Sequence, residues 1–516
     1  MNHIPSSNLI SRRTALSRLS AFGVSAVCCS PVIPQVPGIA NLADYIDERD
    51  EDHSSALQRA INIGNGSVYI PEGTYVIDQV AGNNVRISGK GSLVKKKGTK
   101  GVMLYLSGDS ELTDITIDYN WPATDTRAPY VNNIAVYQNG GSLNLKRVIF
   151  NRSFYAAVYV GGGSLSTDAQ CHFAGAIPHN GLRGNAARLS HYIICVSDEK
   201  TGNHSISIAG GTFIGSSQEK DRLHLNPTGV FITPSVLDGN RYKSVRIIGS
   251  KFIACSTNCG EGNLTGAIDI YNGAENILIE KVEISLFSYA AIKIQNSSNF
   301  KIVNNVVKRG YVPNGAFADQ SLGCATMQKV RGSRQDQRNG LIKNNTFSGL
   351  AYAGIINSCD SVEIDGNTIR GVKYSKSGSA ISNTGHDVTI SNNVGHDVEG
   401  VQIYSSGNNC SIKHNKMDSG NGQSKGAVYF AGKNIIISDN LFVSVRRSGG
   451  SGIRTDGNAS HFTILDNVVN GFPYGVDIRE TVGKVGTGEI RRNKLIGAGI
   501  SVNIPPKRMD LLVGIR

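Results

Sequence analysis

The sequence predicts an all-β fold, a right-handed parallel β-helix (a solenoid) with a short N-terminal capping helix. Short phrases that each end on Asn recur over the last two-thirds of the chain, at Asn305, Asn345, Asn367, Asn393, Asn415, Asn440, Asn467 and Asn493. The steps between them are 40, 22, 26, 22, 25, 27 and 26 residues, a period typical of solenoids. Apolar residues alternate within each phrase, which is the period of a strand with one buried face. No helical pattern lies between the phrases, so alternating α/β units are excluded.

The repeated Asn has a structural explanation. Stacked Asn side chains at a turn can bond the backbone of the next coil, so we expect a ladder and no catalytic role. Similar phrases without the Asn continue toward the N-terminus, at Leu112, Leu145, Ile208, Ile247 and Ile279. We therefore assign residues 80–516 to the β-helix, with coils that can be traced to about residue 500.

Residues 41–79 are predicted to cap the β-helix. The end of a solenoid exposes the apolar stack of its first coil, so a covering element is required there. The segment Ser54 to Ile63 (SSALQRAINI) is amphipathic and is predicted to form the covering helix.

The same region carries a resemblance to a known family. The acidic run DERDED, then SALQRAI, then GSVYIPEGTYVI resembles the opening of the pectate-lyase-like superfamily over residues 44–77. That superfamily includes polygalacturonase-related proteins, bacterial polysaccharide lyases and phage tailspike depolymerases. The resemblance implies the β-helix fold and a carbohydrate substrate, and it leaves the reaction open.

Residues 1–40 resemble a twin-arginine export signal. Arg12 and Arg13 precede a small apolar stretch from Leu19 to Val27, although Arg18 interrupts the apolar region. This predicts a periplasmic or secreted protein. Seven cysteines follow the signal; most are expected to be buried thiols, with Cys171–Cys195 and Cys255–Cys259 as candidate disulfides.

The net charge of the chain indicates the kind of molecule that it binds. The formal charge of +12 favours a polyanion, although part of the excess lies in the signal. The basic residues are spread over loops with no aromatic stacking platform, so nucleic acid is not expected as a partner. No apolar run outside the signal is long enough to span a membrane, so no membrane association is expected for the mature form. The sequence leaves the oligomeric state open.

A second recurring phrase indicates which side chains leave the coil. It starts with Gly or Ala and continues as an alternating strand, as in GAIDIY from Gly266. Residues between the inward Ile, Val or Phe positions are expected to face outward and to stack about 4.8 Å apart on successive coils. The predicted outward residues are Phe231, Thr233, Asp269, Tyr271, Lys293, Gln295, Gln402, Tyr404, Tyr429, Arg454, Asp456, Asp477 and Arg479.

The first candidate site is Asp269, Lys293 and Tyr271, with the carboxylate and ammonium on adjacent coils of one column. A surface ion pair of little consequence is the alternative. Long segments flank the site, and insertions in a tight solenoid often build binding sites. We expect His224 from residues 215–228, and Arg331, Arg334 and Arg338 from residues 308–340, to bind substrate. Gln295, Tyr404, Tyr429 and Arg454 are further substrate-binding candidates.

The second candidate site contains Asp456 and Asp477, whose carboxyls could stand roughly 6.5–9.5 Å apart, as in inverting hydrolases. An Arg–Asp lattice that closes the sheet face is the favoured interpretation here, because the loops at this end are short.

The expected function is β-elimination on an acidic polysaccharide, with Lys293 as base and Tyr271 as proton donor. The arginines would hold the uronate carboxylate, and Asp269 would orient Lys293 or hold a Ca²⁺ ion, the only cofactor considered. An inverting glycoside hydrolase, a C5-epimerase and a non-catalytic polysaccharide-binding protein or adhesin remain the alternatives. The polygalacturonase and pectate lyase motifs themselves are absent, so the sequence gives no support to pectin as the substrate.

Overall fold

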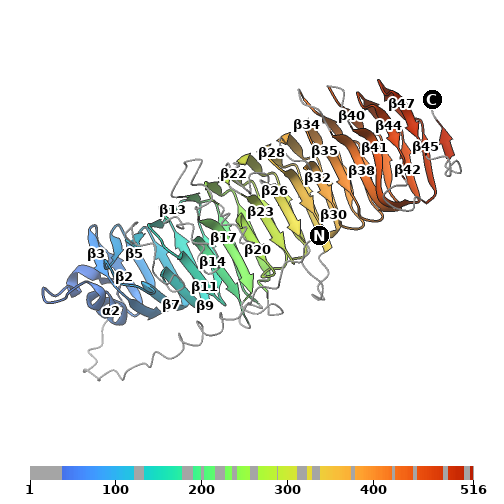
Figure 1. Cartoon of the computed structure of the whole chain (residues 1–516). Coiled ribbons are helices and arrows are strands. Elements are labelled where there is room, and N and C mark those ends of the chain that lie inside the picture. Colours follow the sequence, from blue (N-terminus) through green and yellow to red (C-terminus); the bar gives the residue numbers. More distant parts are fainter. Residues whose placement is uncertain are drawn as a thin grey trace.

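The computed structural model is an elongated rod in which the chain progresses from one end to the other (Figure 1). It describes residues 38–120, 133–176, 190–198, 203–215, 227–234, 241–255, 265–287, 289–310, 322–327, 338–372, 378–420, 425–445, 450–479, 486–504 and 512–514. The predicted export signal therefore lies almost entirely outside the described residues.

The N-terminal end of the rod is covered by the predicted helix. The elements are β1 (Ala40–Asn41), the 3-10 helix η1 (Leu42–Tyr45) and α2 (Ser54–Ile63). Helix α2 buries Ala56, Leu57, Ala60 and Ile61 against the first coil. The short strand β1 pairs in parallel with β2 (Ser67–Ile70), so coil formation begins within the segment 41–79.

Each coil contributes strands to three faces, and every strand pairing is parallel. The first face contains β4 (Val80–Asn83), β7 (Leu104–Thr113), β9 (Ile134–Lys146), β11 (Ala156–Gly161), β14 (His191–Ser197), β17 (Thr228–Pro234), β20 (Gly266–Tyr271), β23 (Ala290–Gln295), β26 (Leu322–Met327), β29 (Ala353–Asn357), β32 (Ser379–Asn383), β35 (Val401–Ser405), β38 (Gly426–Lys433), β41 (Ser451–Ser460), β44 (Tyr474–Asp477) and β47 (Ile500–Asn503).

The second face contains β2, β5 (Arg86–Gly89), the ends of β7 and β9, β12 (Ser164–Thr167), β15 (Ser205–Ala209), β18 (Ser244–Ile248), β21 (Ile277–Glu280), β24 (Phe300–Val303), β27 (Arg338–Lys343), β30 (Asp360–Asp365), β33 (Thr389–Ser391), β36 (Ser411–Lys413), β39 (Ile436–Ser438), β42 (Phe462–Leu465), β45 (Gly488–Arg491) and β48 (Leu512–Gly514).

The third face contains β3 (Thr74–Ile77), β6 (Ser92–Lys95), β8 (Thr116–Asp118), β10 (Ile149–Asn151), β13 (His172–Ala174), β16 (Thr212–Ile214), β19 (Lys251–Ile253), β22 (Glu283–Phe287), β25 (Val306–Gly310), β28 (Thr346–Leu350), β31 (Thr368–Val372), β34 (Val394–Val398), β37 (Lys416–Asp418), β40 (Leu441–Val443), β43 (Val468–Asn470) and β46 (Lys494–Ile496). The predicted β-helix is confirmed.

Like residues stack on like residues inside the rod. The second face supplies an unbroken inward column of Ile208, Ile247, Ile279, Ile302, Ile342, Ile364, Ile390, Ile412, Ile437, Ile464 and Ile490. The third face supplies the stacked rings of Phe150, Phe173, Phe213 and Phe252. Because parallel in-register strands repeat the same position on every coil, each buried side chain packs on one of its own shape.

The recurring Asn residues form the predicted ladder. From Asn305 to Asn467, each side-chain Nδ2 donates to Oδ1 of the next ladder Asn at 2.9–3.0 Å. The backbone N–H of the same residue donates to that oxygen as well. All eight residues are buried, so their hydrogen bonds satisfy the turn between the second and third faces.

The cysteine expectations are confirmed in one part and wrong in the other. Cys171, Cys195, Cys255, Cys324, Cys359 and Cys410 are buried and free. Neither candidate disulfide forms, because Cys171, Cys195 and Cys255 are each packed into the interior as thiols. Burial raises the pKa of the Cys171 thiol to about 11, so it is unreactive at neutral pH.

Candidate functional site

One outward column runs the length of the first face. Strand register places the following residues side by side on successive coils: Ala81, Tyr105, Tyr137, Tyr159, Ile194, Phe231, Asp269, Lys293, Ala325, Ile356, Ser382, Tyr404, Tyr429, Arg454, Asp477 and Asn503. We call this set the first-face column. It contains most of the predicted outward residues, because the period of the recurring phrase reproduces the strand register.

Asp269 and Lys293 form an ion pair within this column. They are opposite each other on β20 and β23, and Lys293 Nζ lies 3.3 Å from Asp269 Oδ2. The Asp269 side chain is 2% exposed and that of Lys293 is 14% exposed. The pair is therefore a largely buried one, and the expectation of an unimportant surface ion pair does not describe it.

The two carboxyl oxygens of Asp269 have different surroundings. Oδ2 accepts from Lys293 and from the Gly266 N–H at 3.3 Å. Oδ1 is buried and accepts no hydrogen bond from the residues that the structure describes. Burial raises the pKa of the Asp269 carboxyl, and this effect outweighs the opposing effects of Lys293 and the Gly266 N–H.

Gly266 makes the local geometry of the pair possible. A Cβ added to Gly266 would lie 2.5 Å from the Ile268 carbonyl oxygen and 3.3 Å from Lys293 Cβ. The absence of a side chain lets the start of β20 curve back so that its N–H reaches Asp269 Oδ2.

Tyr271 and Gln295 lie beside the pair as predicted. They are opposite each other, two residues beyond Asp269 and Lys293 on the same strands. Gln295 is 8% exposed and Tyr271 is half-buried. The four side chains thus bring a carboxyl, an ammonium, a phenol and an amide to two adjacent coils.

The remaining predicted residues around this pair are distributed differently. Arg338 begins β27 on the second face, opposite Asp360, so the register does not bring it to Lys293. His224, Arg331 and Arg334 lie outside the described residues.

The second candidate site is a hydrogen-bonded lattice. Asp477 Oδ2 accepts from Ser451 Oγ at 2.7 Å and from Arg479 Nε at 2.6 Å, and Oδ1 accepts from Asn503 Nδ2 at 2.9 Å. Burial alone would raise the pKa of Asp477, but these three hydrogen bonds outweigh it and hold the pKa below its usual value. Asp456 lies in β41, and its side chain is outside the described part of the chain.

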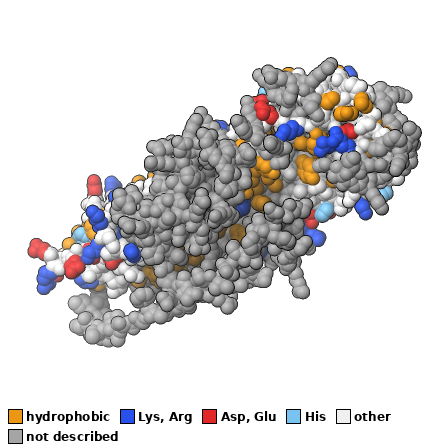
Figure 2. Space-filling view, viewed as in Figure 1, with side chains coloured by type: hydrophobic (Ala, Val, Ile, Leu, Met, Phe, Trp, Pro, Cys, Tyr) orange, Lys and Arg blue, Asp and Glu red, His pale blue; other side chains and the backbone are white. Residues whose placement is uncertain are grey.

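Tyr404, Tyr429 and Arg454 are consecutive in the first-face column. The Arg454 guanidinium lies 3.5 Å from the centroid of the Tyr429 ring, and the Tyr429 hydroxyl donates to the Lys425 carbonyl oxygen. The stacking holds a cation in a fixed position against a flat ring. In the space-filling view, Lys and Arg side chains lie with hydrophobic ones around β35 and β41 (Figure 2).

Gln402 was predicted to face outward, and this is wrong. Gln402 is buried, and its Nε2 donates to the Val443 carbonyl oxygen at 3.2 Å. Strand register joins Val401 and Ile403 to the previous coil and passes over Gln402. Gln402 and Ile403 are both buried, as are Ala380 and Ile381 at the same positions of the previous coil, so simple alternation fails there.

Sequence reasoning missed an aromatic stack at the N-terminal end of the column. Tyr105, Tyr137 and Tyr159 stack with centroids 5.0 and 5.1 Å apart and interplanar angles of 12°. His191 stacks on Phe231 at 5.0 Å on the next coils. The sequence does contain a pattern that predicts this stack. Tyr occupies the middle of the phrases LYL, VYQ and VYV, and these phrases align with GAIDIY.

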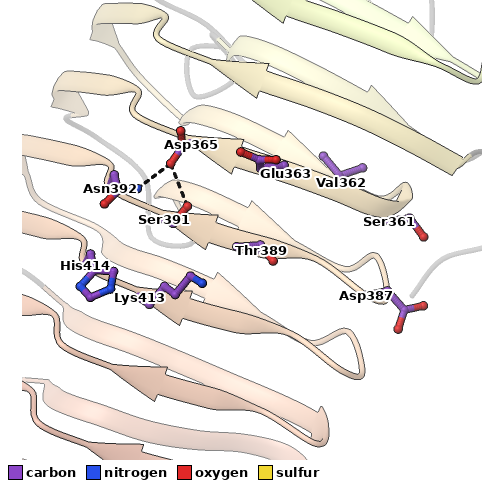
Figure 3. Close-up of a pocket in the computed structure, with 10 residues that line it drawn as sticks. All are labelled: Ser361, Val362, Glu363, Asp365, Asp387, Thr389, Ser391, Asn392, Lys413 and His414. Carbon is purple, nitrogen blue, oxygen red and sulfur yellow. Dashed lines mark hydrogen bonds between the residues drawn. The ribbon is translucent and has the colours of Figure 1, made fainter.

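A polar hollow of about 640 Å³ lies on the second face, away from the first-face column (Figure 3). Glu363, Thr389 and Lys413 reach into it from β30, β33 and β36. Its most buried carboxylate, Asp365, already accepts from Ser391 Oγ, Asn392 Nδ2 and Lys343 Nζ. The hollow is open, and its buried acid is satisfied by the protein itself.

No group of three or more His, Cys, Asp or Glu side chains among the described residues is arranged to hold a metal ion. None of the described helices is long and apolar enough to cross a membrane.

Comparison with known proteins bears on the fold. Residues 353–503 match the family model described as the right handed beta helix region. The fold is therefore a right-handed parallel β-helix, consistent with the pectate-lyase-like superfamily that residues 44–77 resemble. No curated protein matches the chain.

The chain is similar to several solved structures at low sequence identity. A surface adhesin of Streptococcus pneumoniae is 14% identical with a TM-score of 0.42, over 83% of this chain and 92% of that one. The A-module of a mannuronan C-5 epimerase from Azotobacter vinelandii is 12% identical with a TM-score of 0.38, over 90% of this chain and 100% of that one. The tailspike receptor binding domain of Siphovirus 9NA is 12% identical with a TM-score of 0.36, over 91% and 77%. These likenesses are too distant to carry an argument about activity.

Proposed function

We propose that the protein is an exported polysaccharide lyase that cleaves a uronate-containing chain by β-elimination at Asp269 and Lys293. One observation carries the proposal. A buried carboxyl, with one oxygen that accepts no hydrogen bond from the described residues, lies 3.3 Å from an ammonium group on the outward side of a rigid sheet. Such an arrangement costs stability, and acid–base sites are where proteins retain it.

We assign the role of base to this pair because the two groups are in contact, with Lys293 Nζ 3.3 Å from Asp269 Oδ2. Burial favours the neutral form of Asp269, as the raised pKa of this carboxyl indicates. The proposed base is the amine form of Lys293, which has a lone pair on Nζ. A neutral amine can accept a proton from carbon, whereas an ammonium cannot.

The reaction then proceeds on a uronate residue whose C5–H faces Lys293. Lys293 Nζ takes the C5 proton, and the electron pair of that bond moves into the carboxylate as an enolate-like intermediate. The C4–O bond breaks, C4 and C5 become doubly bonded, and the leaving oxygen takes a proton from the Tyr271 hydroxyl. Solvent restores the proton of Tyr271 and removes that of Lys293.

Substrate binding is assigned to the neighbouring polar groups. Gln295 lies beside Lys293 and can hydrogen-bond a sugar hydroxyl, and Tyr404, Tyr429 and Arg454 extend the same face. His224, Arg331 and Arg334 remain predicted contacts for the uronate carboxylate, whereas Arg338 is not kept in this role because it lies on the second face. Ca²⁺ remains a candidate aid to neutralisation of the carboxylate. We also propose that residues 1–40 direct export, which fits a substrate outside the cytoplasm.

Ultraviolet absorbance tests the proposal, since the C4–C5 double bond of the product is conjugated with the carboxylate. The purified mature protein is incubated with a panel of uronate polysaccharides, and rising absorbance is expected. New reducing ends without absorbance would mean hydrolysis, with Asp456 and Asp477 as the acids to mutate. Solvent hydrogen incorporated at C5 without cleavage would mean epimerisation, and binding without either would mean a non-catalytic protein.

A further inference from the structure

The Asp269–Lys293 pair interrupts an apolar stretch of the first-face column. Strands β14, β17, β20, β23 and β26 lie side by side in that order (Figure 1), and β29 follows β26. In chain order, their outward residues in the column are Ile194, Phe231, Asp269, Lys293, Ala325 and Ile356. The carboxyl and the ammonium therefore have two apolar neighbours on either side along the rod.

Each side of the pair is bordered by an apolar cluster that is separate from the interior of the rod. On the N-terminal side, Phe231 lies opposite Asp269, is half-buried and packs against one of these clusters. On the C-terminal side, Ala325 lies opposite Lys293 and is buried in the other cluster, which also contains Tyr289. The pair thus lies between two apolar surfaces, which explains why the outward-facing Asp269 side chain is only 2% exposed.

Tyr289 lies at the edge of the sheet toward which the Asp269 carboxyl turns back. It precedes Ala290, which is opposite Gly266, and the Gly266 N–H is the backbone donor to Asp269 Oδ2. Burial raises the pKa of Tyr289 to about 12, and the negative charge of Asp269 contributes to the same shift. The phenol and the carboxyl are therefore close enough to influence each other.

We infer that Phe231 and Tyr289 are positioning residues of the Asp269–Lys293 pair, which act through the Asp269 carboxyl by keeping water and polar donors away from it. The inference deepens the proposed function and rests on it for the reaction. An aromatic carbon surface offers no hydrogen bond to a carboxylate, so the two rings favour the neutral form of the carboxyl.

The first-face column also contains the opposite case. Asn503 lies opposite Asp477 on the following coil, and its amide donates to Asp477 Oδ1 at 2.9 Å. The carboxyl with a polar neighbour in the column has a lowered pKa, and the carboxyl beside Phe231 has a raised one. The identity of the column neighbour is therefore the difference to test.

Other titratable groups lie near the same carboxyl and must stay unchanged in the test. Lys293 faces it from β23, and Tyr271 lies two residues further along β20. The His191 ring stacks on Phe231 with centroids 5.0 Å apart. Substitutions at Phe231 or Tyr289 leave these three groups in place.

Titration of the Asp269 carboxyl tests the inference without any substrate. In protein labelled with carbon-13 at the aspartate carboxyls, the Asp269 resonance is the one that disappears in Asp269→Asn. Phe231→Asn gives Asp269 an amide neighbour of the kind that Asp477 has, so the pKa of Asp269 should fall by about one unit or more. Phe231→Leu is the matched control, because it keeps an apolar side chain and should leave the pKa nearly unchanged.

A second pair of variants tests the other side of the carboxyl. Tyr289→Ser removes the ring and admits water, so the pKa of Asp269 should fall, whereas Tyr289→Phe keeps the ring and should preserve the raised value. A cooperative thermal transition confirms that each variant is folded, and either Phe231→Asn or Tyr289→Ser is sufficient for the test. In the proposed reaction, both should lower kcat by about tenfold with little change in KM, because they act through the carboxyl.

The outcomes separate this inference from the proposed function. An unchanged pKa of Asp269 in Phe231→Asn and Tyr289→Ser would overturn the inference, and so would an equal fall in Phe231→Leu and Tyr289→Phe. The expected pattern of pKa changes supports it, even if no polysaccharide yields an unsaturated product. In that last case the role of the two rings stands, and the lyase reaction is the part that fails.

Discussion

Two buried carboxylates in the first-face column show how one repeat can serve different ends. Asp269 and Asp477 each lie beside a cation and are each 1% exposed, yet their pKa values move in opposite directions. Asp477 has hydrogen bonds to both oxygens, whereas Asp269 Oδ1 accepts none from the described residues. Burial beside a cation therefore does not by itself set the direction of the pKa shift, because the number of hydrogen bonds that the carboxyl accepts also contributes.

The neighbouring residues cause the difference. Around Asp477 the adjacent coils supply Ser451 and Asn503, and Arg479 follows two residues after the end of the strand. Around Asp269 the residue that corresponds to Ser451 is Thr228 on the preceding strand, and its hydroxyl donates to Thr265 Oγ1. Lys293, opposite Asp269 on the following strand, is the side-chain donor to the carboxyl. The hydrogen bonds of Asp477 tie together three C-terminal coils, whereas we propose that the Asp269 pair is retained for acid–base chemistry at a cost in stability.

The largest effect is expected from Lys293→Ala. Removing the base should lower turnover by about 10³-fold or more, whereas the rod stays folded because Lys293 lies outside the interior. Initial rates of ultraviolet absorbance measure this, with Arg370→Ala as a control of equal charge change. Wild-type rates in Lys293→Ala would remove the Asp269–Lys293 pair from the mechanism.

Asp269→Asn should separate activity from stability. The amide cannot share a proton with Lys293, so turnover should fall by about 10²-fold. At neutral pH the free energy of unfolding should stay the same or rise, because a buried carboxyl with an unsatisfied oxygen is replaced by a neutral group. Chemical denaturation measures it; a large loss of stability would show that Asp269 is structural.

Asp477→Asn should lower the free energy of unfolding and leave turnover nearly unchanged, the reverse of Asp269→Asn. Its three hydrogen bonds lose their charged acceptor, so the free energy of unfolding should fall by roughly 1–3 kcal/mol while turnover changes little. The same denaturation and absorbance assays apply. Complete loss of turnover in a folded variant would move the active site toward the C-terminal coils.

The smallest effect is the pH dependence of these stability differences. The folded pKa of Asp477 is lowered, so its contribution is present above the unfolded value of about 3.9 and is lost as pH falls through the folded pKa. The folded pKa of Asp269 is raised, so stability is lost as pH rises from the unfolded toward the folded value.

The gap between wild type and Asp477→Asn should therefore narrow in acid, and any advantage of Asp269→Asn should grow toward neutral pH. Denaturation midpoints across the acid range measure both trends, and parallel curves for the two variants would contradict the assigned pKa directions.

The sequence was sufficient for the fold and for the register of the main pair. The Asn and Ile positions repeat on each coil, and aligning the second phrase by its Gly or Ala placed Asp269 opposite Lys293 as the structure has them. Burial of Asp269 could not be predicted from the sequence. The alternation of side chains along a strand indicates the direction of each side chain, but it does not indicate which groups surround that side chain. Gln402 was misplaced because it and Ile403 are both buried, so the strand does not alternate at its start. The tyrosine stack was missed because its three tyrosines precede Gly229, the first copy of the phrase that was aligned.

The most direct test of the account is ultraviolet absorbance during incubation of wild type, Lys293→Ala and Asp477→Asn with the same uronate polysaccharides. The account predicts rising absorbance for wild type and Asp477→Asn, and none for Lys293→Ala. Equal rates in wild type and Lys293→Ala, or loss of activity in a folded Asp477→Asn alone, would contradict it.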